Sequence, residues 1–276
     1  MPALLPPLRL TGAHVLRDGA LQRRSLAFAA GRLTRGPLPE VDLTGFLILP
    51  GIVDAHCPLP CPETDLSAFF AQAAASGVTT SVAVLDWGWT GGLRSADRAE
   101  AGMDRLARLR PRLPLDTRLH LRVEETAVRD EPRLMNAIRS RLAHGVVFAD
   151  TPRNPEPCPD DLSDAYRLAQ RERRQVARHL CRIAELLDEY ALPYGSHADP
   201  DGETRERHSM IGARIAVFPA TRRAAAAAHA MMSPVMLSAP AFLAGDPIAT
   251  GLVAEAICDA FASGGQPGTL SAAAFR

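Results

Sequence analysis

The sequence contains no lysine: all 31 basic residues are arginine, balanced by 31 acidic residues. A G- and C-rich genome can produce this bias, but its chemical consequence is the same. The chain cannot use Schiff-base catalysis, a phosphate-loop lysine or a carbamylated lysine that bridges two metal ions. Because the formal net charge is zero, no overall field attracts nucleic acid or an anionic membrane. We expect neither as a partner.

Cysteines and long apolar runs are also scarce. The five cysteines are an odd number in a chain of 276 residues, which argues against a disulfide framework and indicates a reducing compartment. No apolar run reaches the ~20 residues needed to cross a bilayer. The first ten residues lack the pattern of a signal peptide. The sequence therefore predicts a cytoplasmic protein.

The spacing of apolar residues along the chain changes near residue 50. Residues 8–49 show short alternating apolar segments punctuated by Gly, which predict a small β module over residues 1–49. From residue 50 to 276, short apolar runs alternate with longer helical patterns, as in repeated β/α units. The predicted strands lie in 78–87, 115–124, 143–150, 192–198, 213–219 and 233–240, and helical patterns occupy 65–76, 95–110, 131–142, 164–190 and 220–231.

Polar side chains appear where the predicted strands end. Asp86, Glu124, Asp150 and His197 each follow or end an apolar run. A parallel β/α barrel places its active site at the carboxyl ends of its strands. This pattern favours an α/β fold with a TIM-like barrel over residues 50–276, although periodicity alone also allows an open doubly wound sheet.

The string LILPGIVDAHCP at 47–58 resembles the entry into the barrel of the amidohydrolase superfamily. In that superfamily a second metal ligand follows two residues after the first histidine, because side chains two apart on a strand point the same way. Here His56 is present, but the second position is Pro58. His56 is thus either one remaining ligand or a remnant.

Three further segments resemble one branch, the ribose methylphosphonate triphosphate diphosphatases of the carbon-phosphorus lyase pathway of phosphonate metabolism. RLHLRVE at 118–124 matches the family's R-L-H-L-R-C-E, GSHAD at 195–199 matches A-S-H-D-D, and GARIAVFPAT at 212–221 matches a Gly, an apolar strand and F-P-T-T. The resemblance implies an amidohydrolase-type barrel. It also implies a hydrolase in which metal-bound water releases pyrophosphate from a ribosyl triphosphate.

The resemblance also implies the site residues. The metal ligands would be His56, Glu124, Asp150, where the family has His, and His197, holding one divalent zinc, manganese or iron ion, or none. Arg122 and Asp199 would contact a small phosphorylated substrate. Structural alternatives stay open: Arg122 in an ion pair with a neighbouring strand, and Asp150 and Asp199 in turns or helix caps.

Other family positions have lost their function. Where the family has the carboxylate expected to act as general base, this sequence has Gly264. Where the family has an arginine that binds phosphate, this sequence has Ala244. No catalytic residue is therefore assigned. These losses predict impaired hydrolysis, or alternatively an inactive paralogue that acts as a binding or assembly partner. The sequence also ends just after the last expected strand. We therefore expect a barrel that is incomplete at its C-terminal edge, covered by a second copy or a partner chain.

Overall fold

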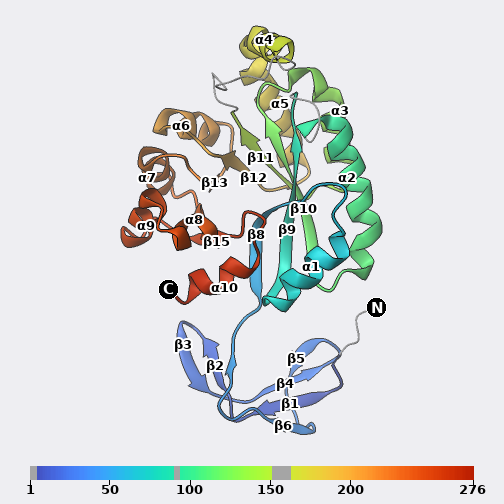
Figure 1. The fold of residues 1–276 in the computed structure, drawn as a ribbon, viewed down its shortest axis with the longest axis vertical. Coiled ribbons are helices and arrows are strands. Elements are labelled where there is room, and N and C mark those ends of the chain that lie inside the picture. Colours follow the sequence, from blue (N-terminus) through green and yellow to red (C-terminus); the bar gives the residue numbers. More distant parts are fainter. Residues whose placement is uncertain (1–4, 90–93, 151–162) are drawn as a thin grey trace. The chain divides into compact units, whose positions relative to one another are not determined.

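The computed structural model describes residues 5–89, 94–150 and 163–276, with only the backbone described at 163–166. It contains two compact units, residues 1–52 and 53–276. The first unit holds two small sheets (Figure 1), one with strand order β5-β4-β1-β6 and one with order β3-β2-β7. Their strands are β1 Leu8–Thr11, β2 His14–Arg17, β3 Ala20–Arg23, β4 Leu26–Ala29, β5 Arg32–Thr34, β6 Glu40–Asp42 and β7 Leu47–Ile48.

The second unit is built on an eight-stranded parallel sheet with strand order β15-β14-β13-β12-β11-β10-β9-β8 (Figure 1). The order follows the chain, as repeated right-handed β/α units require. The fold class predicted from the sequence, a TIM-like barrel with a small N-terminal β module, is confirmed. The strands are β8 Ile52–Pro58, β9 Val78–Trp87, β10 Asp116–Glu124, β11 Gly145–Ala149, β12 Tyr194–His197, β13 Ile215–Val217, β14 Val235–Ser238 and β15 Ala260–Ala262.

The barrel is nearly closed. In the described residues β15 and β8 share no backbone ladder, and the expected incompleteness is confined to this seam. Buried Asp54 on β8 crosses it: its carboxylate accepts hydrogen bonds from the backbone N–H (3.0 Å) and the hydroxyl (2.5 Å) of Ser263, just after β15. The N–H of Gly264 also donates to the carbonyl of His56, at 3.2 Å. Eight strands therefore surround one interior.

Helices cover the outer face of the sheet. In Figure 1, α2 and α3 lie along one side, and α6, α7 and α9 along the other. Alanines of α7 and Leu252 of α9 pack on Val235 and Leu237 of β14. The helices are α1 Leu66–Ala75, α2 Ala96–Leu109, α3 Glu131–Arg139, α4 Ser163–Glu172, α5 Val176–Glu189, α6 Gly202–Met210, α7 Arg222–Ala230, α8 Ala239–Ala244, α9 Pro247–Ala254 and α10 Gly268–Ala274, with short 3-10 turns at η2 Arg110–Arg112, η3 Val128–Asp130 and η5 Arg173–Gln175.

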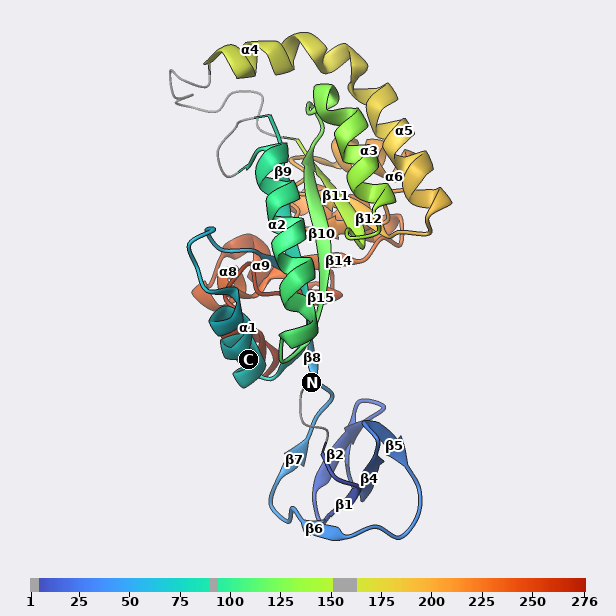
Figure 2. The same ribbon diagram turned by 90° about the vertical axis from the view of Figure 1, so that its right-hand side faces the viewer.

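The single long helix predicted over 164–190 is wrong in one respect. The turn η5 separates α4 from α5, and the helix axis bends there (Figure 2). Six consecutive polar residues, 170–175, interrupt the apolar stripe, so no apolar side chain anchors this stretch to the barrel. Within the described residues, no helix combines the length and apolar character needed to span a membrane.

Candidate functional site

Two histidines meet inside the barrel at the carboxyl ends of opposite strands. His56 of β8 and His197, the last residue of β12, have ring centroids 5.2 Å apart. The ring of Phe218, which follows β13, lies 5.1 Å from His56 and 5.7 Å from His197. Neither ring nitrogen of buried His56 has a hydrogen-bond partner in the described part of the chain. Such a group costs about 1–3 kcal/mol in an empty interior.

Unusual backbone conformations position this group. Ala198 and Phe218 both have positive φ, at 57° and 52°. Their N–H groups donate to the neighbouring strands at Val217 and Met236, both at 2.9 Å. For a bulky residue such as Phe218, positive φ is an outlier that costs ~1–3 kcal/mol. Strain of this kind is concentrated at ligand and active sites.

Arg122 of β10 lies beside the two imidazoles. Its Nε and NH2 groups make a two-pronged ion pair with Asp86 of β9, at 2.6 and 2.8 Å. The two residues are register partners on adjacent strands, so the structural ion pair considered from the sequence is present. The remaining NH1 lies 3.5 Å from Nε2 of His197. Arg94 adds a weaker pair with Asp86 at 3.7 Å.

The electrostatics keep both imidazoles neutral. Burial, followed by the charges of His197 and Arg122, lowers the pKa of His56 well below its ordinary value. Burial and the charge of Arg122 likewise lower the pKa of His197 to about 4. A guanidinium can only donate, so Nε2 of His197 is the acceptor in that contact and its Nδ1 bears the proton. The site therefore presents two neutral rings beside a fixed cation.

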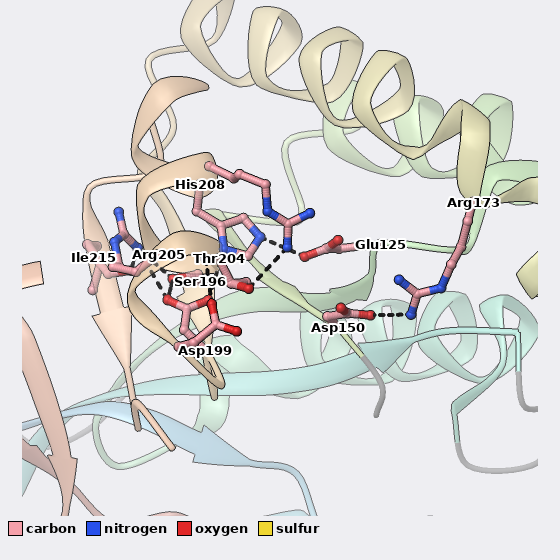
Figure 3. Close-up of polar contacts among 11 residues, drawn as sticks. Glu125, Asp150, Arg173, Ser196, Asp199, Thr204, Arg205, His208 and Ile215 are labelled. Atoms are coloured by element: carbon pink, nitrogen blue, oxygen red, sulfur yellow. Dashed lines mark hydrogen bonds and ion pairs between the residues drawn. The ribbon is translucent and has the colours of Figure 1, made fainter. Parts of the chain in front are cut away.

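The other two predicted ligands lie in different surroundings. Glu124 ends β10 and is buried, and its side chain lies over Gly88, where an added methyl group would be 2.8 Å from its Cγ. Asp150, after β11, bonds to NH2 of Arg173 at 2.9 Å (Figure 3). Residues 151–162, which follow Asp150 in the sequence, lie outside the described residues.

Asp199, predicted to contact substrate, is buried among internal partners. It accepts hydrogen bonds from the hydroxyl of Ser196 and pairs with Nδ1 of His208 at 2.9 Å and with Arg205 at 3.7 Å (Figure 3). Nε2 of His208 bonds to Glu125 at 2.7 Å. These partners place the Asp199 side chain in a buried hydrogen-bonded network, whereas the sequence alternative was a turn or helix cap.

Gly264 and the residues around Ala244 have roles in the backbone structure. Gly264 has a positive φ of 56° and joins the barrel seam through its N–H. In the segment 238–248, Ser238 caps α8 and Asp246 caps α9 with their side chains. Ala244 ends α8. Neither Gly264 nor Ala244 offers a group that could bind phosphate or accept a proton.

A bound metal ion does not fit these residues as they lie. Two neutral imidazoles are suitable donors, but Arg122 places a positive charge against His197 where a second cation would be repelled. In the described segments, no three His, Cys, Asp or Glu side chains group closely enough to hold a metal. The structure brings His56 and His197 together, and leaves Asp150 bonded to Arg173.

The nearly closed eight-stranded parallel barrel and the small β module define a TIM-like α/β barrel fold with an N-terminal β module. Comparison with solved structures identifies particular proteins with this fold. D-hydantoinase from Bacillus sp. AR9 matches with a TM-score of 0.58 and 16% identity, over 86% of this chain and 58% of that one. Dihydropyrimidinase from Brevibacillus agri NCHU1002 matches with a TM-score of 0.62 and 12% identity, over 93% and 68%.

A third solved structure widens the range of activities that share this fold. Beta-aspartyl dipeptidase from Fervidobacterium islandicum AW-1 matches with a TM-score of 0.54 and 15% identity, over 84% of this chain and 65% of that one. At these identities the likeness establishes the fold alone, and the chain spans little more than half the length of the Bacillus hydantoinase. No protein-family model and no curated protein sequence matches the chain.

Sequence reasoning did not assign four residues that shape the site. Asp86 was recognised at a strand end but not as the partner of Arg122, and Arg94, Phe218 and His208 were not singled out. The register of β9 with β10 is the signal that joins Asp86 to Arg122. His208 gives a weak signal because its helix, GETRERHSM, is polar on every face.

Proposed function

We propose that this chain binds a small phosphorylated molecule at the carboxyl ends of the barrel strands without efficient hydrolysis. The observation on which this rests is the cluster of Arg122, His197 and His56. The carboxylate of Asp86 pairs with two nitrogens of the Arg122 guanidinium, which leaves NH1 directed toward His197. An arginine held in this way forms strong charge-assisted hydrogen bonds to phosphate oxygens and loses little side-chain entropy on binding.

The charges support an anionic ligand. Two arginines, Arg122 and Arg94, lie beside the single carboxylate of Asp86, and both imidazoles are neutral. Both ring nitrogens of His56 are buried and have no partner in the described residues. Arg122 is only 20% exposed, and partial burial strengthens such contacts relative to open water. The sequence resemblance to the phosphonate diphosphatases independently favours a ribosyl phosphate.

The second candidate is the metal-dependent diphosphatase reaction itself, at an impaired rate. It is favoured by His56, whose two ring nitrogens have no partner in the described residues although the ring is buried. Against it stand the glycine at position 264 and the guanidinium beside His197. Loss of a general base alone typically costs a factor of about 100 to 10,000 in rate.

Calorimetric titration with pyrophosphate and with adenosine triphosphate, in the presence of EDTA, tests the proposal. We expect binding of one ligand per chain that is lost in Arg122→Gln. Arg118→Gln is the matched control, because Arg118 is an exposed arginine of the same strand whose partner among the described residues is Asp116. Absence of binding to the unmodified chain, or equal loss in both variants, would refute the ligand site.

A parallel assay separates the two candidates. Release of pyrophosphate from a ribosyl triphosphate is measured with and without added manganese, zinc or iron. Binding without release supports the proposal. Release that requires a metal and disappears in His56→Leu establishes the second candidate instead.

A further inference from the structure

A second cavity lies outside the barrel interior, between α5 and α6. Its volume is about 290 Å³, close to the lower limit of small-molecule sites at ~300 Å³. None of the barrel-mouth residues His56, Arg122 and His197 lines it. The lining residues are Glu125, Arg173, Val176, Ala177, Leu180, Cys181, Arg207, His208, Met210 and Ile211.

One side of this cavity is apolar. Val176 and Leu180 face it from α5, and Ile211 from the end of α6. Apolar surface gathered in a concave site gains free energy when an apolar ligand displaces water from it, at ~25 cal/mol per Å². The wall therefore suits the hydrocarbon part of a ligand.

The floor of the cavity is a rigid ionic network. Glu125 bonds to Nε2 of His208, and Nδ1 of His208 bonds to Asp199 (Figure 3). With a carboxylate at each ring nitrogen, the imidazole is held as a cation between two anions. The charge of His208 offsets that of Glu125, and Arg205, 3.7 Å from Asp199, offsets that of Asp199, so the floor has no net charge.

The net charge of the cavity comes from two arginines at its rim. NH2 of Arg173 bonds to Asp150, while its Nε is buried without a partner in the described residues. Exposed Arg207 bonds to the hydroxyl of Thr204 at 3.1 Å and pairs with no carboxylate in the part of the chain that the structure describes. After these pairings, about one positive charge remains at the rim, which favours a single negative charge on the ligand.

We propose that this cavity is a second ligand site, which binds a small organic carboxylate with an apolar body. The carboxylate pairs with Arg207 on the side of the cavity lined by Arg173, and the hydrocarbon part covers Val176, Leu180 and Ile211. Glu125, fixed by His208, closes the inner end. The site is independent of the barrel mouth and of the phosphorylated ligand proposed there.

Calorimetric titration of the full chain with octanoate tests this site, with 1-octanol as the uncharged ligand of the same length. We expect one octanoate per chain and weaker binding of octanol. Arg207→Gln should weaken octanoate binding by about tenfold or more, since a hydrogen bond to a charged partner is lost. Arg178→Gln, an exposed arginine of α5 outside the lining, is the matched control and should bind as the unmodified chain does.

A second variant tests the cavity rather than the charge. Leu180→Trp fills the space from α5 and should abolish octanoate binding. Circular dichroism melting checks that each variant is folded, and a folded Leu180→Trp that binds octanoate normally would overturn the proposal. No binding to the unmodified chain, or an Arg207→Gln affinity equal to that of Arg178→Gln, would overturn it as well. Octanoate binding that is lost in Arg122→Gln but kept in Arg207→Gln would place the ligand in the barrel mouth and refute the second site.

Discussion

Asp54 and Ser263, which are 209 positions apart in the sequence, form two buried hydrogen bonds that join the first and last strands of the barrel. Both side chains are fully buried. Because no backbone ladder links these strands in the described residues, the carboxylate joins them across the seam, together with the hydrogen bond from the N–H of Gly264 to the carbonyl of His56. A buried carboxylate is tolerated here because both of its oxygens accept hydrogen bonds.

We predict that substitutions of Asp54 and Ser263 have strongly coupled effects on the free energy of unfolding. Ser263→Ala should lower the free energy of unfolding by about 1–3 kcal/mol, since one bond to a charged acceptor is lost. Asp54→Ala leaves two buried donors without an acceptor and should cost more, about 3–5 kcal/mol. Urea unfolding of both single variants and the double variant gives the coupling energy. Additive losses would contradict the seam, and Ser271→Ala, at a partly exposed serine of α10, should change little.

The His208 network predicts a loss of stability in alkali. Burial opposes the charged imidazole, but the bonds to Asp199 and Glu125 outweigh it and raise the pKa of His208 to about 9, from an ordinary value of 6.5. A group whose pKa is raised by folding stabilises the fold fully below its unfolded pKa, and this contribution disappears as the pH rises through the folded pKa. Between about pH 6.5 and 9.5 the chain should lose at most about 3 kcal/mol.

Urea unfolding across this pH range measures the effect. His208→Gln retains a side chain able to donate and accept hydrogen bonds but cannot be protonated. This variant should be less stable near pH 6.5 and should show a flatter profile up to pH 9.5. A slope equal to that of the unmodified chain would assign the alkaline loss to other groups.

We predict that the buried imidazole of His56 lowers the stability of the fold and contributes to ligand binding at the barrel mouth. His56→Leu removes two nitrogens that have no partner in the described residues and should raise the free energy of unfolding by about 1 kcal/mol. The same variant should weaken pyrophosphate binding. Destabilisation by His56→Leu, with pyrophosphate binding unchanged, would show that the imidazole has only a packing role.

The same histidines predict a loss of stability in acid. Folding lowers the pKa of His197 to about 4 and that of His56 well below its ordinary value, through burial and the nearby cationic groups. As the pH falls below 6.5, the unfolded chain binds protons that the folded chain excludes, so stability falls toward pH 4. His56→Leu should reduce this slope in the same urea experiment.

We predict that position 195 in β12, which is a glycine, tolerates no side chain. A Cβ added there would lie 2.4 Å from the carbonyl oxygen of Ile215 on the next strand, which cannot move without breaking the sheet. Gly195→Ala should therefore cost about 3 kcal/mol or more. Gly251→Ala in α9 meets no atom within 4 Å and should stabilise the fold by about 0.5–1 kcal/mol. Thermal melting of both variants distinguishes the two cases, and equal effects would contradict the packing at Gly195.

Most barrel strands could be predicted from the sequence because each contains apolar residues in a short segment between two helical patterns. Residues 78–87 form a strand with the predicted limits, and the predicted strand at 115–124 begins one residue later in the structure, at Asp116. The position of His197 at a strand end was likewise readable, because the short segment LPYGSHA follows a long helical pattern. The break of the long helix at η5 was harder to predict, because charged residues are common on helix surfaces. Its only signal is the absence of apolar residues from this stretch.

The contacts of the site were harder to predict because they depend on pairing between distant strands. Arg122 could be placed on a strand, but its two-pronged bond to Asp86 follows from the register of β10 against β9. Glu125 and His208 are 83 positions apart and belong to no recognisable motif. Asp199 follows His197 closely, yet its side chain turns to Ser196 and His208 rather than toward the two imidazoles.

The bond from Asp54 to Ser263 also bears on how the chain acquires its structure. The two residues that close the cylinder lie near opposite limits of the second unit, so this contact has one of the largest loop-closure entropies in the molecule. Contacts of such high sequence separation form late and slow the overall rate. Until Ser263 arrives, the Asp54 carboxylate keeps its hydration shell, so sealing of the cylinder and desolvation of that charge form a single late event.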